Sequence, residues 1–379
     1  MTSSPVPESG RAPLVQLSGV SKSYGGVMAV SGVDLEIARG EFVAIMGPSG
    51  CGKTTTLRML AGLENPSSGS IRLNGEEVRD LAPWQRDTPM VWQSLALFPF
   101  LSVIENVEFG LRMRKVGRAE RRRRATDWLA RLGLADFAQR RVDELSGGQR
   151  QRQRVALARS LVTEPPLLLL DEPLSALDHH LSLKMQGELT RLQRELGIAF
   201  VYVTHSHSEA FAMADRVVIM ANGEVAQCGA PMEVFHRPAS RFVAEFLGGN
   251  NIFQADVVAR DGSRLELRTP EGRFTAEAGA QGGAALAAGA AIDLVVRADR
   301  ISLTAQPGWA TNEVACTLVG EEFIGSTVNG HLETSGGKQI VVQLNAKDLE
   351  EIELDVGRQF YASWHPEDCH LVQRPHAAH

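Results

Sequence analysis

The sequence is poor in features that mark several common protein classes. Its four cysteines are scattered without Cys-x-x-Cys spacing, which excludes a zinc site or a disulfide framework and favours reduced cytoplasmic thiols. No apolar run approaches the roughly 18 residues that a transmembrane helix needs. Residues 1–13 lack a basic start and an apolar core, so we expect a disordered N-terminus and no signal peptide. A role at a membrane would therefore require a partner protein.

An excess of positive charge is also absent. The 379 residues carry a net charge of −6, which argues against the broad polyanion-binding field of nucleic-acid proteins. One basic run, Arg121–Arg124, lies in a stretch with a helical pattern. It fits either contact with nucleic acid or anionic lipid, or the solvated face of a helical subdomain, and the lack of interleaved aromatic residues favours the second. We expect no nucleic-acid partner.

The most informative motif is a glycine-rich stretch at residues 47–55 that fits the P-loop pattern G-x-x-x-x-G-K-[ST]. A short apolar strand precedes it and a helical pattern comes after it, which is the context that a phosphate-binding loop requires. The glycines let the backbone wrap closely around a phosphate, and the helix N-terminus favours an anion. We expect Lys53 to reach the β- and γ-phosphates of ATP and Thr54 to bind Mg²⁺. The predicted nucleotide-binding residues of this loop are Gly47, Pro48, Ser49, Gly50, Cys51, Gly52, Lys53, Thr54 and Thr55.

Polar residues follow two apolar stretches that read as buried strands of a parallel sheet. Asp171 and Glu172 come after four leucines, and His205 comes after residues 199–203. The carboxyl ends of parallel strands are where an α/β sheet binds its ligand. We expect Asp171 to hold Mg²⁺, Glu172 to polarise the attacking water and His205 to sense the γ-phosphate. Capping of the next helix is the alternative role for the acidic pair, and Pro173 and Ser175 weigh against it.

Two further residues have open interpretations. Tyr24 lies about twenty residues before the P-loop and fits either a half-buried core ring or a platform on which adenine stacks. Gln93 ends a short predicted strand and is placed to reach a metal or the attacking water, although the sequence alone favours a plain strand-terminating glutamine.

The order of these motifs resembles that of the ATP-binding cassette (ABC) ATPases. Between the P-loop and the leucine-rich strand stands Leu-Ser-Gly-Gly-Gln, residues 145–149, and Ser175–Asp178 matches that family's D-loop. The resemblance covers residues 14–246 and favours the stacking role for Tyr24. It implies a head-to-tail homodimer, or a dimer with a paralogue, in which ATP lies between one P-loop and the partner's signature. The residues assigned to nucleotide contact on this ground are Ser146, Gly147, Gly148, Gln149 and Asp178.

The chain after residue 246 changes character and has short β-like runs separated by turn residues. It is similar to the accessory β-domain of importer ATPases, and Val296–Ile301 and Phe323–Thr327 carry that weaker match. The predicted fold is an α/β P-loop NTPase over residues 14–246, with a helical subdomain at about 95–160, followed by an all-β OB- or barrel-like domain over residues 247–379.

This sequence departs from the family pattern at two places. Ser206 follows His205 where relatives usually have Asp, and the Arg-Gln unit after the signature occurs twice, over Arg150–Gln153. Two extra helical residues rotate the rest of the helix by about 200°. We expect a bulge or an overhang near residues 149–154 to absorb them.

The resemblance implies the ATPase subunit of an importer that is served by a solute-binding protein. Two transmembrane permeases would hold it at the cytoplasmic face of the bacterial inner membrane. The motif pattern of residues 92–112 and of the tail favours a polyamine as the solute. Sugars, ferric iron, phosphonates and opines are the alternative solutes. A soluble cassette protein acting on DNA or ribosomes would usually carry two cassettes or a coiled-coil insertion. A small-molecule kinase would not explain residues 145–149.

Overall fold

The computed structural model describes residues 12–145, 148–278, 287–308, 310–345, 349 and 352–374. The chain divides into two compact units, Met1–Val234 and Phe235–His379. The sequence predicts that residues 1–13 are disordered. Residues 1–11 of that segment lie outside the described residues. The division falls earlier than residue 246 because helix α9 (Arg241–Leu247) belongs to the second unit, where Ala244 packs in a small core with Ile252 and Val295.

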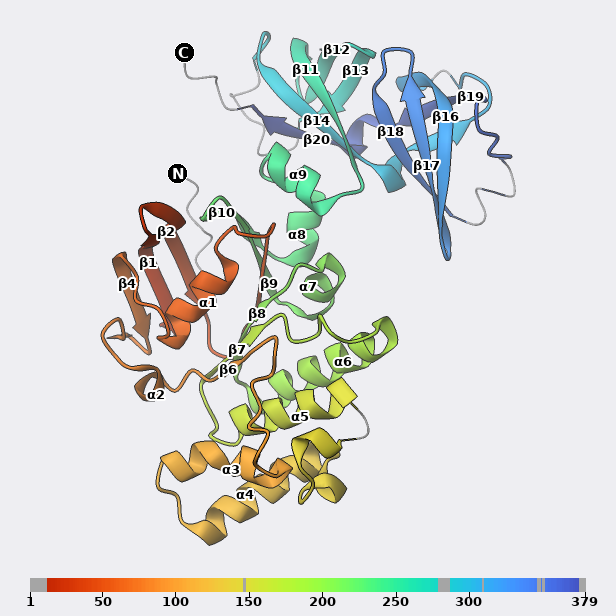
Figure 1. Ribbon diagram of the computed structural model, residues 1–379. Coiled ribbons are helices and arrows are strands. Elements are labelled where there is room, and N and C mark those ends of the chain that lie inside the picture. Colours follow the sequence, from red (N-terminus) through yellow and green to blue (C-terminus); the bar gives the residue numbers. More distant parts are fainter. Residues whose placement is uncertain are drawn as a thin grey trace. The chain divides into compact units, whose positions relative to one another are not determined.

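The first unit is built on a six-stranded sheet of strand order β10-β9-β3-β8-β7-β6 (Figure 1). All neighbours in it are parallel except the β9–β10 hairpin. That hairpin turns at Asn222 and Gly223, which both have positive φ, as a two-residue turn of this kind requires. The strands are β3 (Phe42–Met46), β6 (Met90–Val91), β7 (Leu167–Asp171), β8 (Ala199–Val203), β9 (Arg216–Ala221) and β10 (Glu224–Gly229).

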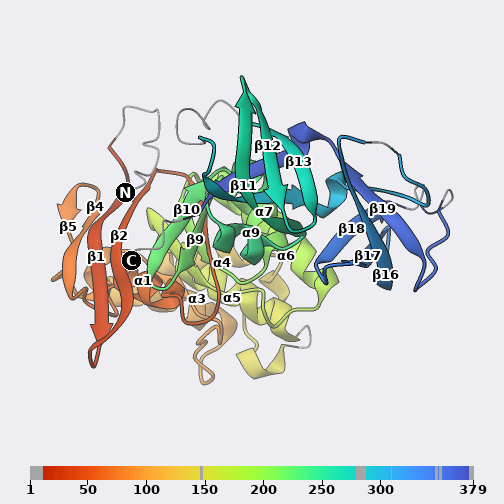
Figure 2. The ribbon, with the colours of Figure 1, turned by 90° about the horizontal axis from the view of Figure 1, so that it is seen from above.

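The central strands are buried on both faces, as their unbroken apolar runs predict. In β7, Leu167 and Leu169 belong to one core cluster, and Leu168 and Leu170 belong to the other. The first of these cores includes helix α1 (Lys53–Ala61) and an antiparallel sheet of order β2-β1-β4-β5, which forms one edge of the unit in Figure 2. Its strands are β1 (Val15–Tyr24), β2 (Val27–Ile37), β4 (Ser68–Leu73) and β5 (Glu76–Glu77).

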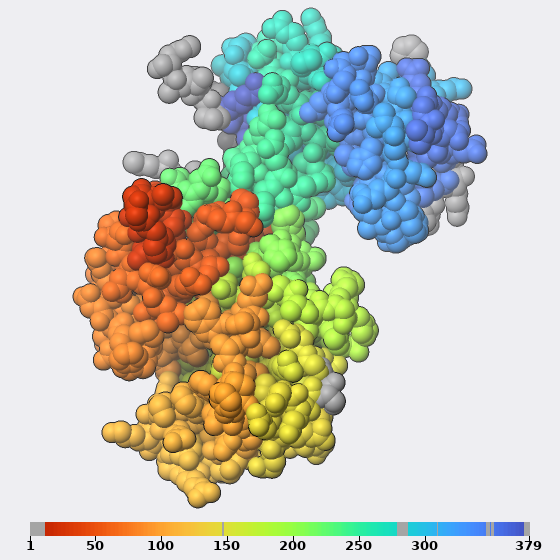
Figure 3. Space-filling view, in the orientation of Figure 1, coloured from red at the N-terminus to blue at the C-terminus, as the bar shows by residue number. Residues whose placement is uncertain are grey.

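The other core continues into a helical subdomain, which forms the orange and yellow lobe of the first unit in Figure 3. Its entry helix α3 begins at a capping box, in which the amide of Ser102 donates to the Glu105 carboxylate at 2.8 Å. The helices of the first unit beside α1 are α2 (Pro83–Arg86), α3 (Val103–Met113), α4 (Arg118–Arg131), α5 (Gly148–Leu161), α6 (His179–Leu196) and α7 (His207–Met213), with 3₁₀ turns at Ala135–Phe137 and Val142–Glu144. The helix α8 (Pro231–His236) spans the division.

The basic run of α4 is only partly exposed to solvent, because Arg121 and Arg122 pair with the buried Glu108 of α3 at 3.4 and 3.1 Å. Arg123 pairs with Glu120 at 2.8 Å and with Asp127 at 3.1 Å, and Arg124 pairs with Glu120 at 2.7 Å. Hydrogen bonds from Arg123 and Arg124 lower the pKa of Glu120 to about 2. Neighbouring carboxylates on the same helix therefore offset much of the positive charge.

After α9, the second unit is built of β-strands, as the sequence predicts for the C-terminal domain. Two antiparallel five-stranded sheets enclose one apolar core, in the orders β13-β12-β11-β14-β20 and β15-β19-β16-β17-β18 (Figure 2). The strands of the first sheet are β11 (Asn250–Asp261), β12 (Arg264–Thr269), β13 (Gly272–Glu277), β14 (Ala291–Arg297) and β20 (Cys369–Gln373). Those of the second are β15 (Ser302–Thr304), β16 (Asn312–Ile324), β17 (Thr327–Thr334), β18 (Gln339–Asn345) and β19 (Gln359–Trp364), with 3₁₀ turns at Ala298–Arg300 and Pro366–Asp368. Across the described ranges, none of the helices combines the length and the apolar character that crossing a bilayer demands.

Candidate functional site

At two positions, the loop between β3 and α1 has a backbone conformation and a close contact that only glycine fits. Gly47 has φ +152°, and a Cβ there would lie 2.3 Å from the Met220 carbonyl oxygen. At Gly52, with φ +101°, a Cβ would lie 2.5 Å from the Ala29 carbonyl oxygen. The glycines therefore let this loop pass between β9 and β2, and α1 starts directly after it at Lys53. Free amide groups at the start of a helix make this end suited to an anion.

Lys53 lies inside the loop rather than in solvent. Its side-chain Nζ donates to the carbonyl oxygens of Gly47 at 2.8 Å and Pro48 at 2.9 Å, and the residue is only 8% exposed. The neighbouring Cys51 is buried in the apolar core, and burial raises the pKa of its thiol. The ammonium group is thus bound by the carbonyl oxygens of the loop itself, beside a neutral thiol that serves packing.

The next residue of α1 meets the end of β7. Thr54 Oγ1 donates to Asp171 Oδ1 at 3.2 Å. Burial raises the pKa of the Asp171 carboxyl, and the hydrogen bond from Thr54 opposes that shift. A hydroxyl and a carboxylate oxygen are the ligands that Mg²⁺ takes beside a phosphate. The donor set fits this ion, and the pair that the sequence assigned to it lies together.

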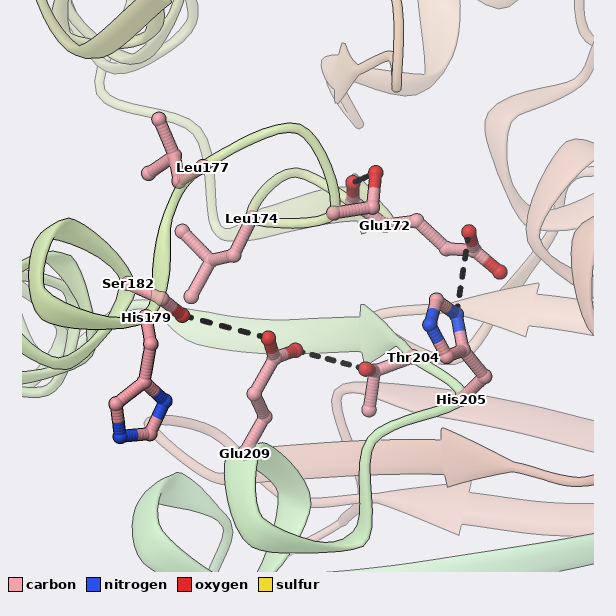
Figure 4. A pocket seen from close by; sticks show the side chains of 9 residues that line it. Glu172, Leu174, Leu177, His179, Ser182, Thr204, His205 and Glu209 are labelled. Carbon is pink, nitrogen blue, oxygen red and sulfur yellow. Dashed lines mark hydrogen bonds and ion pairs between the residues drawn. The ribbon is translucent and has the colours of Figure 1, made fainter.

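Glu172 is the centre of a second group of polar side chains (Figure 4). Its Oε2 lies 3.5 Å from His205 Nδ1 and accepts from Gln93 Nε2 at 3.4 Å. Gln93 also donates to Ser175 Oγ at 3.3 Å. The backbone at Glu172 has φ +44°, a left-handed conformation that is uncommon outside glycine. The structure therefore brings together the three residues for which the sequence predicts catalytic roles, and it adds Ser175.

The structure tests none of the remaining predicted nucleotide contacts, and those that it describes lie on other elements than Glu172. Tyr24 is 43% exposed at the end of β1, and Lys22 Nζ lies 4.9 Å from its ring centroid. Gly148 and Gln149 open α5, while Ser146 and Gly147 lie outside the described residues. The carboxylate of Asp178 accepts from the Leu181 amide at 3.0 Å and so caps α6. Their roles toward a nucleotide stay predictions.

The two departures from the family pattern have structural outcomes. Ser206 Oγ accepts from the Glu209 amide at 3.3 Å as the N-cap of α7, a position that Asp and Ser fill about equally well. The doubled Arg-Gln lies in the first turns of α5, which opens on the left-handed Gly148, with φ +55°, and continues to Leu161 without a bulge. Arginine and glutamine are good helix formers, which explains the regular geometry.

Sequence reasoning missed two residues beside the site. The side chain of Arg159 donates to the carbonyl oxygens of Leu95 at 2.9 Å and Ala96 at 2.7 Å, just after Gln93. Leu95 and Ala96 both have positive φ. Glu209 accepts hydrogen bonds from the hydroxyl groups of Tyr202 and Thr204, which both precede His205 in the chain. A carboxylate four residues after His205 was the only signal in the sequence for Glu209, and Arg159 had none because its partners lie 63 and 64 residues away.

Comparison with known proteins identifies the family. The ABC transporter model matches residues 30–175, and the TOBE domain model matches residues 294–372. The spermidine/putrescine import ATP-binding protein PotA of Rubrobacter xylanophilus is 42% identical over 366 residues, covering 96% of this chain and 95% of that protein. PotA of Thermobifida fusca is 43% identical over 366 residues, covering 95% of this chain and 94% of that protein.

Solved structures agree for the first unit. The dimeric ATP-binding cassette MJ0796 in a post-hydrolysis state with ADP and Pi is 35% identical, with a TM-score of 0.52 over 57% of this chain and 98% of that one. The cbiO1 protein of Clostridium perfringens, part of the ABC transporter complex cbiONQ, is 32% identical, with a TM-score of 0.55 over 59% of this chain and 91% of that one. With this P-loop site and a C-terminal TOBE domain, the chain belongs to the ABC transporter family as an ATP-binding subunit of the importer type.

Proposed function

We propose that this importer-type ATPase drives the uptake of a polyamine of the spermidine or putrescine kind. The observation that carries the proposal is identity above 40% over nearly the whole chain, TOBE domain included, to proteins named for that import. Sugar, ferric iron, phosphonate and opine importers are the alternatives. The transported solute does not touch this subunit, so the assignment rests on the relatives and not on a pocket of this chain. A soluble cassette that is not coupled to transport is the rival of another class.

The first unit binds ATP through the P-loop in this proposal. Amides of residues 47–55 and the Lys53 ammonium receive the phosphates, and the ring of Tyr24 stacks on the adenine. Lys53 turns from the carbonyl oxygens of Gly47 and Pro48 to the β- and γ-phosphates. Thr54, Asp171 and Gln93 hold Mg²⁺, which neutralises phosphate charge when bound.

Hydrolysis of ATP to ADP and phosphate depends on Glu172. Its carboxylate accepts a hydrogen bond from the attacking water and orients it in line with the γ-phosphate, while Gln93 fixes the carboxylate from one side. His205, beside the same carboxylate oxygen, contacts the γ-phosphate. The positive φ at Glu172 turns its side chain toward this group instead of along the strand.

A second protomer completes each site in this proposal. Ser146, Gly147, Gly148 and Gln149 of one copy meet the γ-phosphate held by the other, because the start of α5 offers amide groups to an anion. Asp178 lies at the same junction. ATP then holds two copies together, and hydrolysis releases them. Two permeases bind the dimer at the cytoplasmic face of the bacterial inner membrane, and a solute-binding protein delivers the polyamine to them.

The experiment combines a catalytic variant with a transport assay. Glu172→Gln keeps ATP binding but lowers turnover by about 10²–10⁴-fold, because it removes the water-orienting carboxylate. It also traps an ATP-bound dimer that is visible by size exclusion. The matched control is Glu195→Gln on α6, whose carboxylate makes an exposed pair with Arg191 at 3.7 Å. Turnover within a few-fold of wild type in Glu172→Gln would contradict the mechanism.

The solute is tested with the whole transporter. Vesicles that hold the wild-type subunit and its two permeases are expected to hydrolyse ATP faster when a spermidine-loaded binding protein is added. Maltose, ferric iron, a phosphonate and an opine serve as the comparison solutes. Stimulation by one of these and not by spermidine would overturn the polyamine assignment and leave the ATPase assignment standing.

A further inference from the structure

A second carboxylate lies behind His205, on helix α7 (Figure 4). Oε2 of Glu209 accepts two short hydrogen bonds, from the Tyr202 hydroxyl at 2.6 Å and from the Thr204 hydroxyl at 2.7 Å. Tyr202 is fully buried in β8, and burial together with the nearby Glu209 carboxylate raises the pKa of its phenol. The phenol therefore stays a neutral donor, and the carboxylate is held at a fixed point at the end of the strand.

These bonds enclose the turn that carries His205. Thr204 Oγ1 donates to Glu209 and also accepts from the Ser206 amide at 3.0 Å, so it fixes the backbone on the far side of His205. Ser206 Oγ in turn accepts from the Glu209 amide at 3.3 Å. The His205 side chain is 67% exposed and lies beside Glu172 at 3.5 Å. Its direction is therefore set through its two chain neighbours, and both of them are bound to Glu209.

The same carboxylate reaches the helix that follows the D-loop. Ser182 Oγ donates to Glu209 Oε1 at 3.5 Å, and Gln186 Nε2 donates to Ser182 Oγ at 3.3 Å. Both residues belong to α6, whose first turn Asp178 caps. Figure 4 shows Ser182, Glu209 and Thr204 in one line that leads from α6 toward His205. The Glu209 carboxylate thus joins Thr204, which precedes His205, to Ser182 of helix α6.

We propose that Glu209 is a positioning residue for ATP hydrolysis: by binding Thr204, it fixes the direction of His205 beside Glu172 and couples that direction to α6. This inference rests on the proposed ATPase site and adds a residue to it. The alternative is a purely structural role, in which Glu209 only provides hydrogen-bond acceptors for buried hydroxyl groups, because buried polar groups generally have such partners. In that case its loss would affect folding and not the reaction.

Steady-state ATPase kinetics on the full-length protein separate these roles. Glu209→Gln and Thr204→Val are expected to lower kcat by about tenfold or more, since small misplacement of a reacting group is costly. The KM for ATP stays within about twofold of wild type, because the P-loop that binds ATP is untouched. In a His205→Ala background the same changes are expected to have no further effect on the residual rate, because Glu209 acts through His205. Glu195→Gln is the matched control and leaves kcat unchanged.

A spectroscopic readout covers the case in which the His205→Ala rate is too low to measure. Imidazole NMR of the histidine-labelled protein gives a signal for His205, assigned by its loss in His205→Ala. The signal is expected to shift or broaden in Glu209→Gln and in Thr204→Val, and to stay in place in Glu195→Gln.

Three results bear against the inference. A wild-type kcat in both Glu209→Gln and Thr204→Val overturns it, as does an unmoved His205 signal in both. An equal further loss in the His205→Ala background also overturns it, because it shows that Glu209 acts elsewhere. Each of these leaves the proposed function intact provided that wild type hydrolyses ATP and Glu172→Gln does not. A wild type without ATPase activity contradicts the proposed function itself.

Discussion

Removing Arg150 and Gln151 tests how the doubled Arg-Gln affects the nucleotide site. Beyond its first residue, Gly148, whose φ is +55°, helix α5 runs to Leu161 without a bulge, so a change of length in its first turns passes directly to its start. Val155 and Leu161 are fully buried and hold the other end in the core. Deleting two residues moves the start along the axis by about 3 Å and turns it by about 200° relative to those anchors.

Misplacing a catalytic group by about 1 Å can lower the rate by about 10²-fold. A displacement of about 3 Å at the start of α5 is therefore large enough to change turnover. The deletion restores the single Arg-Gln-Arg spacing of the family after the signature. We therefore expect ATP turnover per dimer to equal or exceed that of wild type, with an unchanged circular dichroism spectrum. The assay is phosphate release at saturating ATP, over a range of protein concentrations so that dimer formation is separated from turnover.

The control keeps the length and changes the side chains. Replacing Arg150 and Gln151 by alanine preserves the helix, since alanine is the best helix former, and is expected to leave turnover unchanged. Loss of hydrolysis in the deletion protein, or unfolding seen by circular dichroism, would refute the reasoning and show that the doubled unit is integral to this helix. An effect of the alanine pair as large as that of the deletion would show that side chains, and not register, matter here.

Four further predictions concern single features of the site. Lys53→Ala is expected to lose affinity for a fluorescent ATP analogue at equilibrium, because the main cation on the phosphates is removed; unchanged affinity would contradict the P-loop assignment. Asp171→Asn is expected to raise the Mg²⁺ concentration at half-maximal ATPase rate, since a charged ligand is lost, and an unaltered Mg²⁺ titration would argue against that role. A fragment of residues 1–246 is expected to bind ATP as the full chain does, and a folded fragment that fails to bind it would show that the second unit contributes. Arg159→Lys is expected to lower kcat by about tenfold without a change in KM, because lysine cannot hold both carbonyl groups after Gln93; a wild-type kcat would show that this pair of hydrogen bonds is dispensable.

The parts of the site that the sequence predicts are those that follow from strand ends. Asp171, Glu172 and His205 come directly after apolar runs, and the rule for ligand sites in α/β sheets places them together. The P-loop is a contiguous motif and needs no long-range information. The sequence alone leaves the role of Gln93 open, and the pairing of its strand β6 with β7 in the structure brings it beside Glu172.

The parts of the fold and of the site that the sequence does not predict depend on contacts between residues that are distant in the chain. Glu209 lies on a helix face, and only the fold shows that Tyr202, Thr204 and Ser182 converge on its carboxylate. The all-β character of the second unit follows from alternating apolar residues, but its sheet order does not. Strand β14 pairs with β20, although a whole second sheet lies between them in the chain, and no turn chemistry marks that partnership. The pairing of such distant strands and its register are set by how their apolar faces pack in the core.

The left-handed backbone at Glu172 has a consequence for engineering this protein. A residue with φ +44° is strained by roughly 1–3 kcal/mol unless it is glycine, asparagine or aspartate. A library selected for heat resistance alone would therefore enrich asparagine at this position and would discard the carboxylate that we propose orients the attacking water. Thermostable variants of this chain should be sought with codon 172 held fixed, so that rigidity is gained at other positions and turnover is kept.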